Sequence, residues 1–302
     1  MKKLVVFCLL FFIAGSCLWG QDKSNIKRDT TKGFDFFFNP GMYFGHKKNA
    51  NYYRGMPSAM ESDYANPDIQ YVLRNPYWRI DIMRLIIDNY RNVVADTFWL
   101  KQPSGMRYTA NLSFGIGARY RFTKNLSIGV SFTQARMTAH GYAYLGVKIM
   151  DFNSDDEIKC LLVGKERRNS FELIANYVFS QGIVSPFLEA GMHVNNTKVI
   201  SSDLVVEDVP FSMLNMYGQG VVYDPTMPPT RIDRKLGGVG YGFSAALGLR
   251  ISFNRWAAIE PVAQFRLEKV NLAGYNDITP NFNIMIRLVL GDKVFAKTGG
   301  EK

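Results

Sequence analysis

Ten charged side chains lie in segments where apolar residues alternate with small or polar ones, and each occupies a position on the non-apolar face. Carboxylates held beside arginines can relay protons or act as a general acid and base. They can also form a neutralised network, because a charge in a low-dielectric space needs a partner. The equal numbers of the two signs favour the network. The ten residues are Asp35, Glu172, Glu189, Glu260, Glu268, Arg119, Arg121, Arg250, Arg266 and Arg287.

The chain has three histidines, His46, His140 and His193. His140 is the best placed for acyl-transfer chemistry because Thr138 and Tyr142 are close to it in sequence, but no adjacent serine completes a nucleophile pair. No glycine-rich phosphate-binding loop and no metal-ligand spacing occurs. The sequence therefore predicts no catalytic, cofactor-binding or metal-binding residue, and we expect a protein that is not an enzyme.

The segment that carries Arg119 and Arg121 shows how these charges are positioned. From Tyr108 to Phe122 the even-numbered residues are apolar or small, and the odd-numbered residues are small, polar or basic. A period of two indicates a strand with two different faces. Segments of about 9 to 11 such residues can cross an outer membrane as tilted strands, with the apolar face toward lipid.

Seven further segments repeat this alternation, so the pattern is not a property of one strand. An even number of strands is typical of bacterial outer-membrane barrels, and we expect an all-β fold, an eight-stranded antiparallel up-and-down transmembrane β-barrel. The eight segments lie at residues 34–45, 108–122, 126–133, 170–179, 188–195, 239–252, 257–268 and 281–290.

The lengths of the connections alternate between long and short along the chain. Outer-membrane barrels have tight periplasmic turns and extended extracellular loops, and this order places both chain ends in the periplasm. A soluble β-sandwich has no reason to sort its loops in this way. The short turns lie at 123–125, 180–183 and 253–255, and the longer connections at 46–107, 139–168, 196–237 and 273–279.

On this pattern and turn order, and on the Glu260-Pro261 pair and the segment 185–189 beyond tight turns, the chain resembles a known group. It is similar to the eight-stranded outer-membrane β-barrel proteins of Gram-negative bacteria, the broad OmpX and OmpW-like group. The likeness covers residues 33–291. It implies a location in the outer membrane and insertion by the outer-membrane insertion machinery. Some eight-stranded barrels modify lipid A, an alternative function for which His140 is the candidate residue.

The first twenty residues have the layout of a secretory signal, with Lys2 and Lys3 before an apolar stretch and small residues after it. Cleavage after Gly20 is the preferred processing, and lipidation of Cys17 is the alternative. Cleavage leaves Cys160 as the only thiol, which we interpret as a small apolar residue. The predicted organisation is a signal peptide at 1–20, periplasmic segments at 21–32 and 292–302, and the barrel at 33–291.

The first long connection contains a helix pattern, since five apolar residues fall at helical spacing. We expect a helix that lies on the lipid surface or docks a partner, or one that caps the barrel mouth with its apolar side down. Its apolar residues are Trp78, Ile82, Leu85, Ile86 and Tyr90.

Prolines mark the irregular places in this pattern. Pro40 lies in the middle of the first strand segment, where we expect a local bulge because proline cannot donate to the strand ladder. Pro186 and Pro261 lie just past short turns, where proline is tolerated. Residues 210–230 are rich in proline and glycine and predict an irregular loop.

The formal net charge of +10 raises the question of where the excess basic residues lie and which anionic partner they contact. Two charges leave with the signal peptide, the inward charges cancel, and the remaining excess lies in loops and tails. Outer-membrane lipid and lipopolysaccharide are then the expected partners, other envelope proteins are further candidates, and nucleic acid is not expected. Because an eight-stranded barrel is narrow, we expect no large pore. The function expected is structural or binding, through the extracellular loops, with an accessory role in an envelope secretion or assembly complex as a further alternative.

Overall fold

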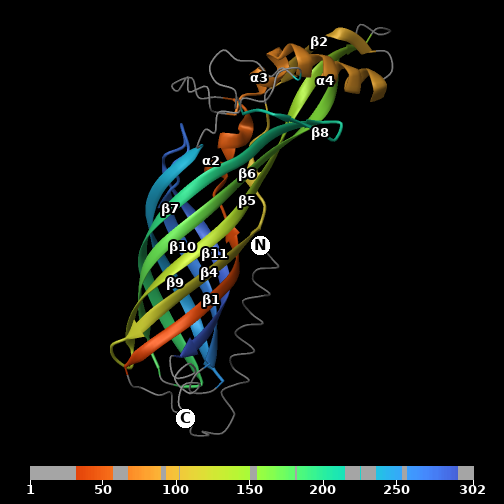
Figure 1. Ribbon diagram of the computed structural model, residues 1–302. Coiled ribbons are helices and arrows are strands. Elements are labelled where there is room, and N and C mark those ends of the chain that lie inside the picture. The colour runs from red at the N-terminus through yellow and green to blue at the C-terminus, as the bar shows by residue number, and fades with distance from the viewer. Residues whose placement is uncertain are drawn as a thin grey trace, which may run out of the picture.

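The computed structural model describes residues 32–56, 67–89, 93–101, 103–149, 155–180, 182–214, 225, 236–253 and 257–291. Eight strands close a ring in which each strand is antiparallel to both neighbours (Figure 1). The predicted eight-stranded barrel is confirmed. In ring order the strands are β1 (Gly33–Phe44), β4 (Asn111–Arg121), β5 (Leu126–Ile149), β6 (Asp155–Val178), β7 (Val184–Val206), β9 (Gly237–Ser252), β10 (Ala257–Lys269) and β11 (Ile278–Gly291).

The two faces of the barrel are inverted relative to a water-soluble protein. On β4, Ile116 is 62% exposed on the outside, whereas Arg119 is 4% exposed on the inside. Soluble monomers rarely expose contiguous apolar patches larger than a few hundred Å². The outside of the ring is apolar on every strand, and we call this surface the apolar belt. Its members include Phe36, Phe38, Leu112, Ile128, Phe132, Phe171, Leu188, Val194, Phe243, Leu247, Phe265, Ile284 and Leu288.

Among the described helices, none is both long and apolar enough to cross a membrane.

Short turns lie at one end of the barrel. Between β4 and β5 the turn is closed by hydrogen bonds from Phe122 N to Leu126 O at 3.1 Å and from Leu126 N to Thr123 Oγ1 at 3.0 Å. The start of β1 and the end of β11 are at this same end, since Asp35 pairs with Gly291. Both ends of the described barrel therefore lie on the short-turn side, as the order of connections predicts.

Pro40 does not produce the predicted bulge. The register of β1 against β4 runs without a shift through Pro40, which is opposite Phe114. Toward β11 the same register holds on either side, at Phe38 and Gly41, and only the two residues between them leave the ladder. The missing N–H of proline is accommodated by this local loss of pairing, so the prediction of a bulge was wrong.

Three strands continue far beyond the apolar belt, which corrects the prediction of loops at 139–149, 155–168 and 196–206. Residues 150–154 and most of 215–235, and with them most of the predicted irregular loop at 210–230, lie outside the described residues. β5 and β6 stay paired from Leu126 opposite Tyr177 to Lys148 opposite Asp155. β7 runs on to Val206 and turns back as β8 (Val209–Ser212). The loop prediction failed because the alternation reverses its polarity along these strands, as outward positions become polar and inward positions become apolar.

The inner side of the extended strands is covered by the segment between β1 and β4. It contributes α2 (Lys47–Ala50), η2 (Asn51–Arg54), α3 (Ile69–Arg74), α4 (Pro76–Asn89), β2 (Val93–Lys101) and β3 (Arg107–Tyr108). We call this segment, together with residues 136–166 and 198–214, the cap. It has a continuous apolar core of its own, which includes Tyr53, Ile69, Val72, Ile82, Leu145, Ile158, Leu162 and Leu204.

The predicted helix in the first long connection is confirmed as α4. Ile82 and Ile86 are buried in the cap core, and Trp78 and Leu85 pack against it, while Tyr90 lies outside the described residues. Figure 1 places α4 at the far end of the extended strands, away from the barrel mouth. The apolar side therefore packs against the protein, but it covers the cap core and not the mouth of the barrel.

Cys160 lies on the inner side of β6, fully buried in the cap core, which agrees with its interpretation as a small apolar residue. Burial raises the pKa of its thiol to about 12, with a smaller contribution from Glu207. Since the thiolate is the reactive form, we expect iodoacetamide at pH 8 to leave Cys160 unmodified in the folded protein and to modify it in urea. Mass spectrometry of protein lacking residues 1–20 measures this directly, and rapid modification without urea would contradict a packed cap.

Candidate functional site

The interior of the barrel holds the charged residues that the alternation singles out. Nearest the short-turn end, Glu260 is fully buried and forms ion pairs with three arginines. Its carboxylate lies 2.5 Å from Arg119 Nη2, 2.6 Å from Arg250 Nε and 3.3 Å from Arg287 Nη1. Arg250 and Arg287 lie on β9 and β11, the two strands next to β10, whereas Arg119 lies on β4, which is not a neighbour of β10, so its contact reaches across the lumen.

Two more carboxylates complete this lower layer. Arg287 forms two hydrogen bonds with Glu189, at 2.6 and 3.0 Å, the two-pronged geometry in which guanidinium and carboxylate bind most strongly. Asp35 lies 3.1 Å from Arg250 and 3.3 Å from Arg121. Four arginines from three strands, β4, β9 and β11, thus share three carboxylates, and no charge in this layer is left without a counter-charge.

A middle layer joins β6 to β9 and β10. Arg266 Nη2 lies 2.8 Å from Glu172 Oε2, and Gln264 donates a further hydrogen bond of 2.9 Å to the same carboxylate. The hydroxyl of Ser244 also donates to Glu172. A carboxylate that receives three donors is held in one orientation, which suits a structural tie between strands.

The upper layer connects the barrel with the cap. Glu268 lies 3.1 Å from His193 Nε2 and 3.1 Å from Arg168 Nη1, and the hydroxyl of Tyr43 donates to it. Arg168 in turn lies 2.6 Å from Glu166. A chain of contacts therefore runs from the barrel lumen to the first residues of the cap.

Tyr53 continues this chain into the cap. Its hydroxyl donates a hydrogen bond of 2.6 Å to Glu166, while its ring is buried in the cap core. Gly164, two residues before Glu166 on β6, leaves room for the Tyr53 ring, since a Cβ at Gly164 would lie 2.1 Å from Tyr53 Cγ. The cap is thus attached to the barrel by a buried polar contact as well as by the shared strands.

All ten predicted inward charges lie in the interior and take part in ion pairs. Sequence reasoning missed Glu166 and Arg168, which are 1% and 2% exposed, because it assigned 139–168 to a loop. The signal was present, since the alternation Glu166, Arg168, Ser170 continues without a break into Glu172. The missed pair adds one charge of each sign, so the balance is kept.

The three ion-paired layers and two aromatic rings occupy the interior of the barrel. Contacts cross the lumen in all three layers, and the rings of Phe37 and Tyr43 fill space between the charged groups, with the Arg287 guanidinium 4.7 Å from the Phe37 ring centroid. Each buried arginine or carboxylate needs its counter-charge, so removing one partner destabilises the strands that the pair joins. Within the described residues we find no geometry for proton abstraction from a substrate, because each carboxylate of the network already receives its donors from the protein.

The histidines are dispersed over the molecule. His46 precedes α2 and accepts a hydrogen bond from Lys48 N, and His193 is part of the upper layer. His140 lies on the outer face of β5, opposite Arg107 on one side and Val163 on the other. Within the described part of the chain no serine or threonine hydroxyl is hydrogen-bonded to His140.

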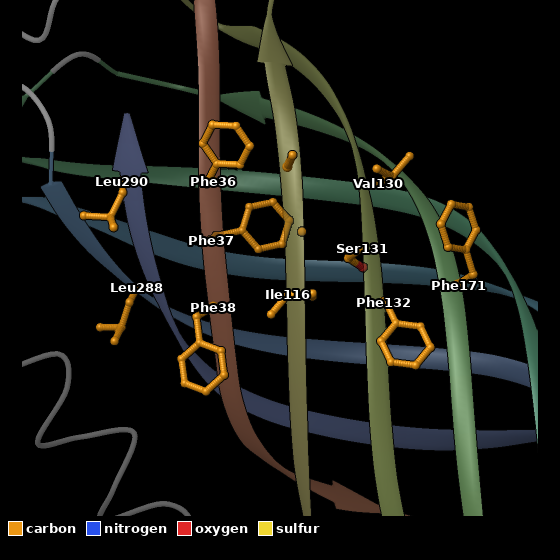
Figure 2. Close-up of a pocket in the computed structure, with 12 residues that line it drawn as sticks. Phe36, Phe37, Phe38, Ile116, Val130, Ser131, Phe132, Phe171, Leu288 and Leu290 are labelled. Atoms are coloured by element: carbon orange, nitrogen blue, oxygen red, sulfur yellow. The ribbon is translucent and has the colours of Figure 1, made fainter. Parts of the chain in front are cut away.

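The apolar belt contains a shallow groove with a volume of about 610 Å³. It runs from β11 across β1, β4 and β5 to β6, and the side chains of Phe36, Phe38 and Ile116 lie on one side and those of Val130 and Phe132 on the other (Figure 2). Gly117 and Ala118 form its floor because they have little or no side chain. The lining is almost entirely apolar, so the groove suits a hydrocarbon chain.

No known protein family and no curated protein matches the sequence of this chain. Similar solved structures include Neisserial surface protein A, which is 11% identical over 86% of this chain and 98% of its own, with a TM-score of 0.41. The outer membrane protein OprG from Pseudomonas aeruginosa is 12% identical over 87% and 96%, with a TM-score of 0.32. Ail, the attachment invasion locus protein of Yersinia pestis, is 9% identical over 86% and 97%, with a TM-score of 0.33. By its own strand pairing and inverted burial, this chain is an eight-stranded antiparallel transmembrane β-barrel that carries a folded cap.

Proposed function

We propose that the protein resides in the outer membrane of a Gram-negative cell, where the plugged barrel is an anchor and the cap presents a structural or binding surface outside the cell. The observation that carries this proposal is the inverted burial, in which apolar side chains face outward and ion pairs fill the interior. A barrel of this width with a filled interior supports attachment and not bulk diffusion.

The orientation follows from the two ends of the barrel. Short turns and both described chain ends lie on one side, which in outer-membrane barrels is the periplasmic side, and the cap lies on the other. The signal-like residues 1–20 support export. We further propose outer-membrane lipid and lipopolysaccharide as partners of the exterior, the insertion machinery as the route of assembly, and other envelope proteins as partners of the cap.

The experiment that tests this proposal is site-directed labelling in intact cells. In a Cys160→Ser background, Arg84→Cys on α4 and Lys124→Cys in the turn between β4 and β5 place one thiol at each end of the molecule. We expect a membrane-impermeant maleimide to label Arg84→Cys in intact cells, and Lys124→Cys only after the outer membrane is permeabilised.

Two outcomes would contradict the proposal. Labelling of Lys124→Cys but not Arg84→Cys in intact cells would reverse the orientation. Recovery of the protein as a soluble monomer without detergent would refute the membrane location. A folded barrel in detergent is recognised independently by strand-rich circular dichroism and by a gel mobility that changes on boiling.

A further inference from the structure

Three cations lie side by side on the outer face, just beyond the apolar belt. Arg136 on β5 is directly opposite Arg167 on β6, which is directly opposite Lys198 on β7. Neighbouring strands are about 4.8 Å apart, and like charges directly opposite one another destabilise a sheet. Within the described residues none of the three forms an ion pair with a carboxylate. We call these residues the cation row, and it lacks the counter-charges that every layer of the interior has.

A row of amides separates the cation row from the belt. Gln134, Asn169 and Asn196 are opposite one another on the same three strands, and Gln134 donates a hydrogen bond of 2.9 Å to Asn169. Two residues along a strand correspond to about 6.6 Å, so the amide groups and the charges form two successive layers. Polar amides at this level suit the ester or amide linkages of a lipid.

The next row belongs to the apolar belt. Phe132, Phe171 and Val194 are opposite one another and are 42%, 58% and 52% exposed. Phe132 and Phe171 also line the end of the shallow groove, as Figure 2 shows. One surface therefore presents, in order along the strands, an apolar groove, hydrogen-bonding amides and three cations, which is the order of groups along a phosphorylated lipid.

We propose that the outer face of β5, β6 and β7 is a binding site for an anionic lipid whose headgroup carries phosphate monoesters. Its phosphate lies among Arg136, Arg167 and Lys198, its linkage groups contact Gln134 and Asn169, and an acyl chain occupies the groove. Arginine forks match phosphate oxygens in a two-pronged geometry. A free phosphate would use the cations alone, whereas the continuity of the three rows with the belt requires a lipid. This inference rests on the proposed function, because it assumes that the belt is in a membrane.

The test compares two triple variants in neutral maltoside detergent. R136Q/R167Q/K198Q removes the cation row, and K47Q/R74Q/R84Q removes three exposed cations of the cap as a matched control. The probe is bisphosphorylated hexa-acyl lipid A, and bound lipid is counted by native mass spectrometry. A cation near an anionic lipid surface is worth roughly a fivefold change in affinity, so we expect the first variant to bind on the order of 100-fold more weakly and the control to match the wild type.

Thermal stability provides a second readout, since the difference in Tm between R136Q/R167Q/K198Q and the wild type is expected to change when lipid A is added. In neutral detergent alone, R136Q/R167Q/K198Q is expected to be at least as stable as the wild type, because repulsion along the row is removed. Added lipid A is expected to raise the Tm of the wild type and of the control, but not that of this variant, since a ligand stabilises the state that it binds. Ala118→Phe, which fills the floor of the groove, is expected to weaken lipid binding while the row remains intact.

Two further ligands separate a lipid site from simpler alternatives. Inorganic phosphate, which has no acyl chain, and phosphatidylcholine, whose single phosphodiester charge is cancelled by its own choline cation, are each expected to leave the Tm unchanged. Equal stabilisation by inorganic phosphate would overturn the proposal in favour of a free-anion site, and equal lipid A binding by both triple variants would overturn it outright. Each protein is first shown to have a gel mobility that changes on boiling. Loss of lipid selectivity in a folded barrel refutes this inference alone, whereas the absence of a detergent-dependent barrel refutes the proposed function.

Discussion

Glu260→Ala is expected to destabilise the barrel by about 3 to 5 kcal/mol, the cost of removing one partner of a buried ion pair. Glu260 is fully buried and lies within 3.3 Å of Arg119, Arg250 and Arg287. Its removal leaves more positive than negative charge in a closed space that water enters poorly. Urea titration in detergent, followed by circular dichroism and by the gel shift on boiling, measures the loss of stability.

Glu157→Ala is the matched control for this prediction. Glu157 forms an ion pair with Lys101 in the cap, but about half of its side chain is exposed, and pairs of this kind contribute less than about 1 kcal/mol. Glu260→Ala combined with Arg250→Met is expected to recover part of the loss, because one unpaired charge is then removed. Equal effects of Glu157→Ala and Glu260→Ala would show that the interior is hydrated and not a closed network.

The alternation of apolar and polar residues was sufficient to predict the barrel, its eight strands and its ten inward charges. Each transmembrane strand has one lipid face and one interior face, so the pattern has the same meaning in all eight. Arg119 and Glu260 could be assigned to the interior because each lies among the small and polar residues of its strand, which alternate with apolar residues on the other face. Which charges meet could not be predicted, since the partners of Glu260 come from three strands at different distances along the chain.

The cap could not be predicted because the pattern reverses within single strands. On β5 the outward residues change from Phe132 to Arg136, while the inward residues change from Ser131 to Ala139. The strand continues, but lipid outside is replaced by water and the ion-paired lumen by an apolar core. The outward face is no longer apolar beyond Phe132, so the sequence pattern predicts a loop where the strand in fact continues. For this reason Glu166 and Arg168 were missed.

Leu247→Arg is expected to destabilise the barrel by about 2 to 4 kcal/mol if Leu247 is near the bilayer midplane. Leu247 is 64% exposed on β9, between Leu188 of β7 and Ala263 of β10 on the outer face. In water an arginine at so exposed a position would have a free-energy effect within about 0.5 kcal/mol. The size of the effect therefore reports on the solvent at this position, which is hydrocarbon if the belt lies in a membrane.

Ile80→Arg provides the comparison that isolates the solvent. Ile80 is 48% exposed on α4, outside the belt, and the substitution introduces the same side chain in place of a similar aliphatic one. We expect no more than about 0.5 kcal/mol for Ile80→Arg, measured by unfolding in lipid vesicles of fixed composition. Two equally small effects would place Leu247 in water and remove the basis of the membrane proposal. A large effect at Leu247 alone would show that this position contacts hydrocarbon. Because the apolar belt continues around every strand of the ring, the whole belt would then be covered by lipid.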